Sequence, residues 1–119
     1  MPNVRVGYNQ QTGQVEFSPN GGNVRMRGRG RIFFTPADPE HPVVFQSFTL
    51  NPEDLAQFPR TVTPGQIDVD DRFTDTQEKS YEYTVVVKVD NGATKAGDPQ
   101  IVNQPGAMAG VGSGSTGPA

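Results

Sequence analysis

Hydrophobic and polar residues alternate along most of this chain, in short runs separated by glycine, proline and asparagine. Such alternation is typical of β-strands with one buried face. The runs at residues 3–8 and 14–18 flank a turn-forming segment, Asn9–Gly13, and predict a β-hairpin. The most regular run, residues 81–90, places five large residues on one face: Tyr81, Tyr83, Val85, Val87 and Val89.

Further strands are predicted at residues 23–35, 43–50, 66–70 and 100–103. The run at 43–50 is nearly apolar on both faces, which predicts a strand central to a sandwich. One segment, residues 51–58, favours a short helix, because Asn51 can serve as its N-cap and Pro52 suits the first helical position.

This order of elements predicts an all-β fold, an antiparallel β-sandwich of about seven short strands with one short helical turn. The sandwich domain is expected to span residues 1–103. Residues 104–119 are rich in glycine, alanine and serine and have no periodicity, so we expect a flexible tail or an assembly arm.

One strand carries a family resemblance. The pattern Tyr81-x-Tyr-x-Val-x-Val87 resembles the penultimate strand of immunoglobulin-like and fibronectin type III domains, which opens with a buried tyrosine. The resemblance covers about a third of the chain and implies an immunoglobulin-like sandwich, with no activity attached. The chain departs from those families in having no tryptophan, no cysteine and a proline-rich link, Pro36–Pro42.

Composition limits the classes of function. The 119 residues include no cysteine, so there is neither a disulfide nor a thiolate to act as nucleophile or metal ligand. The net charge is −3, which disfavours nucleic acid as a partner. We find neither a signal peptide nor an apolar run that could cross a membrane, and we expect a cytoplasmic or particle-associated protein.

The strongest candidate site is a row of four arginines at alternate positions, Arg25, Arg27, Arg29 and Arg31. On a continuous strand their side chains would share one face at intervals of about 6.7 Å. They could pair with acids such as Asp68 on neighbouring strands, dock onto an acidic protein subunit, or bind a polyanion such as nucleic acid. Glycines 28 and 30 leave open whether the strand is continuous.

Two other groups could bind ligands. Four acids around the end of the predicted strand at 66–70 could hold a hard cation, although they lack the spacing of an EF-hand and surround Arg72. These weak metal candidates are Asp68, Asp70, Asp71 and Asp75. The single histidine, His41, lies near two acids in the sequence but has no sequence signature of a nucleophile or of further metal ligands.

Together these features predict a non-catalytic structural or assembly subunit without a cofactor. It would act through protein–protein contacts, for example as a coat, decoration or filament component of a virus-like or bacterial particle. Its partners would be other protein subunits or further copies of itself, bound through Arg25, Arg27, Arg29 and Arg31. The alternative is a soluble binding module for a polyanion or acidic ligand at the same arginines.

Overall fold

The structure is a computed structural model that describes residues 2–90 and 92–105. These residues are mostly in β-strands. The elements, in chain order, are β1 (Asn3–Asn9), β2 (Gln14–Ser18), η1 (Asn20–Gly22), β3 (Val24–Met26), β4 (Gly30–Pro36), β5 (Val44–Thr49), η2 (Pro52–Gln57), β6 (Arg60–Thr63), β7 (Gln66–Asp71), β8 (Lys79–Glu82), β9 (Thr84–Lys88), β10 (Thr94–Gly97) and β11 (Gln100–Asn103). The predicted tail lies almost entirely outside the described residues.

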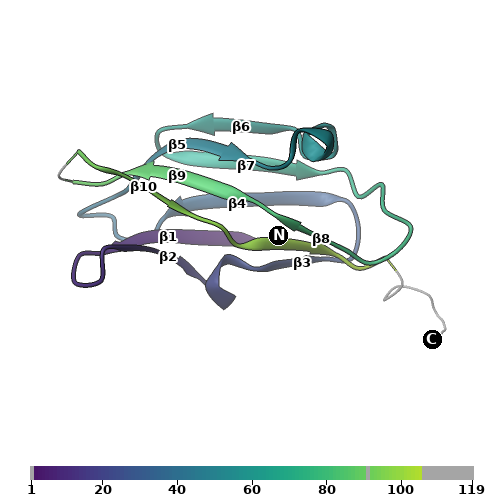
Figure 1. Cartoon of the computed structure of the whole chain (residues 1–119), viewed down its shortest axis with the longest axis horizontal. Helices are drawn as coiled ribbons and strands as arrows, with labels where there is room; N and C mark the ends of the chain where they lie inside the picture. Colours follow the sequence, from purple (N-terminus) through teal and green to yellow (C-terminus); the bar gives the residue numbers. More distant parts are fainter. Residues whose placement is uncertain (1, 91, 106–119) are drawn as a thin grey trace.

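The strands form two layers (Figure 1). One layer is a five-stranded sheet in the order β2-β1-β4-β7-β6. The other contains two three-stranded sheets, β10-β9-β5 and β3-β11-β8. β8 leads directly into β9, and β10 leads directly into β11, so the same two chain segments take part in both small sheets. No described helix is long and apolar enough to cross a membrane.

The core between the layers centres on three aromatic rings, Phe34, Phe48 and Tyr83, each at most 2% exposed. Their ring centroids lie 5.2–5.6 Å apart. The Tyr83 hydroxyl donates a hydrogen bond of 2.6 Å to the carbonyl of Gly22, so its one polar atom is paired inside the core. The inward face predicted for residues 81–90 is confirmed, since all five of its large residues are buried.

The predicted antiparallel sandwich is confirmed as a mostly β fold, but two of its strand pairs are parallel. β1 runs parallel to β4, and β3 runs parallel to β11. The reason lies in the connections: η1 and the turn after β3 carry the chain from one layer to the other. Consecutive strands therefore do not pair with each other there, and each finds a neighbour that is distant in sequence.

The predicted arginine strand at residues 23–35 is also two strands. β3 lies in one layer and β4 in the other, and the chain reverses direction between them at residues 27–29 (Figure 1). Glycine is a weak strand former, and Gly28 lies at the centre of the reversal. We call residues 25–31 the arginine turn.

Two smaller predictions need correction. Residues 43–50 do not form a central strand, because β5 is an edge strand of its sheet and has a bulge between Phe45 and Ser47. The bulge shifts the alternation, so that Phe45 and Phe48 both point inward while Val44 is exposed. The predicted short helical turn is confirmed as the 3₁₀ segment η2, but the Asn51 side chain makes no capping hydrogen bond.

Candidate functional site

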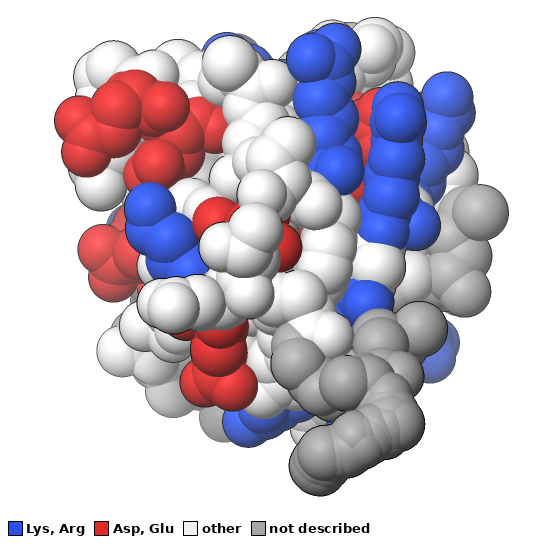
Figure 2. Space-filling model, turned by 90° about the vertical axis from the view of Figure 1, so that its right-hand side faces the viewer, with Lys and Arg blue, Asp and Glu red and all other residues white. Residues whose placement is uncertain are grey.

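The arginine turn lies at one end of the elongated molecule, where β3 ends and β4 begins. Figure 2 views this end and shows a group of Lys and Arg side chains on one side of it, with Asp and Glu side chains mostly on the other. All four arginines of the turn are exposed. The four arginines therefore do not lie in one row on a single strand. They follow a bend between β3 and β4, and their charged groups are still exposed to solvent.

Two of the four arginines pair with acids of β7. Arg29 Nη2 lies 3.1 Å from Asp70 Oδ2, and Arg31 Nη1 lies 3.0 Å from Asp68 Oδ2. Arg31 is opposite Asp70 in the β4–β7 register, so each pair is diagonal rather than directly across. The arginine side chains are 68% and 58% exposed, so each pair contributes at most about 1 kcal/mol to stability.

The other two arginines, Arg25 and Arg27, make no ion pair with any described residue. Arg25 is the middle residue of β3, and Arg27 follows that strand directly. β3 is itself an edge strand of its sheet. These two guanidinium groups are therefore free to meet an acidic group from outside the described chain.

The predicted acidic cluster does not gather around one point. Asp68 and Asp70 face the arginine turn, whereas Asp71 is completely buried and Asp75 accepts a hydrogen bond from Tyr81. Within residues 2–90 and 92–105, no three His, Cys, Asp or Glu side chains are arranged to hold a metal ion. The four acids thus have separate contacts and do not form one site.

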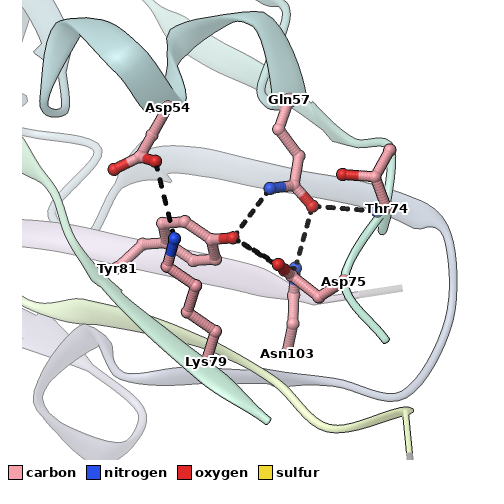
Figure 3. Close-up of polar contacts among 7 residues, drawn as sticks. All are labelled: Asp54, Gln57, Thr74, Asp75, Lys79, Tyr81 and Asn103. Carbon is pink, nitrogen blue, oxygen red and sulfur yellow. Dashed lines mark hydrogen bonds and ion pairs between the residues drawn. The ribbon is translucent and has the colours of Figure 1, made fainter. Parts of the chain in front are cut away.

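A polar cluster missed by the sequence analysis lies beside the arginine turn, under η2 (Figure 3). The Tyr81 hydroxyl donates to the Asp75 carboxylate at 2.7 Å and accepts from Gln57 Nε2 at 2.8 Å. Asn103 Nδ2 donates to Asp75 Oδ2 at 2.9 Å. Burial and the nearby Asp75 raise the pKa of Tyr81 above its usual value, so the hydroxyl remains a donor.

This cluster links η2, the β7–β8 loop, β8 and β11. A pocket of about 400 Å³ opens beside it and is lined by Gln57, Tyr81 and several charged residues, including Lys79. Lys79 Nζ approaches Asp54 at 4.0 Å across the pocket (Figure 3). The groups are hydrogen-bonded to one another, and these bonds hold η2, the β7–β8 loop and β11 together.

Asp71 is the most unusual group of this region. Its Oδ1 accepts from the Phe73 amide at 2.9 Å and from Asn103 Nδ2 at 3.2 Å. Its Oδ2 and Asn103 Oδ1 are both buried without a hydrogen-bond partner among the described residues. Burial raises the pKa of Asp71 to about 6, against the opposing effect of its two hydrogen bonds.

His41 lies at the opposite end of β4 from the arginine turn. Its Nδ1 is 2.9 Å from Asp90 Oδ2, and both side chains are well exposed. They border a pocket of about 360 Å³ that also includes Tyr8 and Asp38. The histidine thus has one carboxylate partner, which the sequence could not indicate because Asp90 is 49 positions away.

Comparison with known proteins adds no relative. No protein-family model matches the chain, and no curated protein matches it. The geometry of the arginine turn and its surroundings is therefore what indicates a function.

Proposed function

We propose that this protein is a non-catalytic structural or assembly subunit that binds an acidic segment of another protein through Arg25 and Arg27. The observation that carries the proposal is the division of the arginine turn into two internally paired and two unpaired side chains. Arginine forks suit carboxylates. Because Arg29 and Arg31 already have partners, the arginines available for binding are Arg25, in the edge strand β3, and Arg27, directly after it.

We also propose that the fold is a variant of the immunoglobulin-like sandwich. In immunoglobulin domains one sheet contains strands B, E and D in that order, and the other contains C, F and G. The orders β4-β7-β6 and β5-β9-β10 support this assignment. The variant would differ in its first hairpin, whose β1 runs parallel to β4, and in Tyr81, whose hydroxyl bonds a side chain rather than the backbone.

A polyanion remains the alternative partner, and the ion pairs make it less favourable. Asp68 and Asp70 place two negative charges among the four arginines. With only two free guanidinium groups, the log–log salt dependence of duplex DNA binding would have a slope of about −1.8. Such a slope corresponds to about two phosphate contacts, far fewer than the roughly 6–10 that give strongly salt-dependent DNA binding.

The proposal can be tested with a photo-crosslinking residue placed next to the arginines. Gly28 is suitable because it lies between Arg27 and Arg29 with open space around it. In cells that produce the protein, we expect crosslinking from position 28 to give a discrete protein adduct. The crosslinked partner peptide should be rich in Asp or Glu, and the double variant Arg25→Glu/Arg27→Glu should lose the adduct because like charges repel.

The matched control is the same crosslinker at Gly65, which also has open space and lies at the other end of β7. Position 65 should give no such adduct. Identical adducts from both positions, or none from position 28, would contradict the proposed function. Adducts with nucleic acid alone would establish the polyanion alternative instead.

A further inference from the structure

The outer edge of β3 is open for hydrogen bonding. β3 is the terminal strand of the sheet β3-β11-β8, and no described strand pairs with its other side. The Met26 carbonyl accepts from the Gln104 amide, with Asn103 in register with Met26. In a parallel ladder, alternate residues direct their peptide groups to the same side. The N–H and C=O of Arg25 therefore point away from β11, towards the open edge.

The surroundings of this edge leave space for another chain. A pocket of about 160 Å³ lies between β3 and the start of β1. Its lining includes three asparagines, Asn3, Asn20 and Asn23, together with Arg25. Amide side chains can both donate to and accept from a peptide backbone.

The positive charges at this edge favour an acidic partner strand. Val24 and Met26 are buried, so Arg25 faces outward and Arg27 follows two positions later. A second copy pairing through its own β3 would bring arginines against arginines, which is unfavourable between neighbouring strands. Acidic residues at alternate positions of an incoming strand would instead meet Arg25 and Arg27.

We infer that the edge of β3 accepts an extended acidic strand from a different protein, with carboxylates at alternate positions opposite Arg25 and Arg27. This inference rests on the proposed function and specifies its binding mode. The incoming strand would become a fourth strand of the sheet β3-β11-β8. Its backbone hydrogen bonds would supply affinity, and the arginines would supply specificity.

The inference can be tested with the purified protein and synthetic peptides. The probe is an eight-residue peptide that alternates Glu and Val, and the charge control alternates Lys and Val. Two further versions of the Glu peptide carry N-methyl groups on alternate residues, one set on each edge of the strand. Binding is measured by calorimetry, and exchange of the Arg25 amide hydrogen is followed by NMR.

We expect the Glu peptide to bind, the Lys peptide not to bind, and only one of the two N-methylated peptides to lose at least about tenfold in affinity. The Arg25 amide should exchange more slowly in the complex. Arg25→Glu should weaken binding about tenfold or more, whereas Lys88→Glu, at the exposed end of β9, should leave it unchanged.

The outcomes separate the binding mode from the proposed function. If both N-methylated peptides bind as well as the unmodified Glu peptide, the contact is made by charge alone. Strand addition is then wrong, but the proposal of an acidic partner still stands. If both lose affinity, pairing along a single edge is wrong. If no Glu peptide binds, the inference fails, and the crosslink from position 28 still decides whether an acidic partner exists.

Discussion

Replacing Gly22 by alanine should destabilise the protein by roughly 3–5 kcal/mol, because the added methyl group meets both backbone strain and crowding. Gly22 has a φ of +84°, a conformation that costs other residues strain. A Cβ there would lie 2.7 Å from Phe17 Cβ and 2.9 Å from Pro99 Cγ. Neither atom belongs to a flexible side-chain end, so the neighbouring backbones would have to move.

Gly22 also bears on the proposed binding, because it connects the core to the strand that carries Arg25. Its carbonyl accepts the Tyr83 hydroxyl, which fixes η1 to the centre of the core. β3 begins two residues later, so the same contact sets the position of the strand that carries Arg25. A Gly22→Ala protein that stays folded should therefore also bind the proposed acidic partner less well.

Two other glycines serve as controls that distinguish backbone strain from steric crowding by the added methyl group. Gly92 has the same φ of +84° but nothing within 4 Å of an added Cβ, so Gly92→Ala should cost only about 1–2 kcal/mol. Gly65→Ala should be nearly neutral, because that residue has neither a positive φ nor a close neighbour. Urea unfolding of the three variants measures these differences. Equal losses for Gly22→Ala and Gly92→Ala would show that crowding around Gly22 is unimportant.

The sequence predicted the β-rich fold and the buried face at residues 81–90, because strand alternation is a local property. It could not predict where the chain changes layers. The alternation of residues 23–35 continues through Arg27 and Arg29, although the backbone reverses there. The parallel pairs were missed for the same reason, since pairing between distant strands depends on the whole set of connections.

The candidate site was partly predictable. Arginines and acids at alternate positions suggested ion pairs, and Asp68 and Asp70 do pair with Arg31 and Arg29. The contacts of Asn103 left no signal in the sequence. Its partners lie 28 to 46 positions away, and amide side chains have no characteristic spacing. Asp71 looked like one more surface acid beside Asp70, because the two are adjacent in sequence.

Asp71→Asn should stabilise the protein at pH 7.5 and flatten the dependence of its stability on pH. The pKa of Asp71 is about 6 in the folded protein, against 3.8 for an ordinary aspartate. A raised pKa means that folding favours the protonated carboxyl. This stabilisation is complete below about pH 3.8 and is lost as the pH rises through about 6, and its full extent is up to about 3 kcal/mol.

The geometry explains why an amide should replace the acid well. Asp71 Oδ2 and Asn103 Oδ1 are two buried acceptors without a partner in the described part of the chain. Protonation of Asp71 turns Oδ2 from an unpaired buried acceptor into a donor, in a site where Asn103 already bonds Asp71 Oδ1 and has an unpaired acceptor of its own. The amide of Asp71→Asn carries such a donor at every pH, and therefore removes the cost of burying a charge.

Urea unfolding between pH 4 and pH 8 measures this effect. The natural protein should lose stability between about pH 4 and pH 7 relative to Asp71→Asn, and the two curves should come together at the acidic end. Asp70→Asn is the control, since Asp70 is adjacent but pairs with Arg29 at the surface. Asp70→Asn should keep most of the pH dependence of the natural protein, because the charge of Asp70 is only a minor cause of the raised pKa of Asp71. Parallel curves for Asp71→Asn and the natural protein would mean that Asp71 is ionised in the folded state without cost, and that its buried oxygen finds a partner when the protein is in solution.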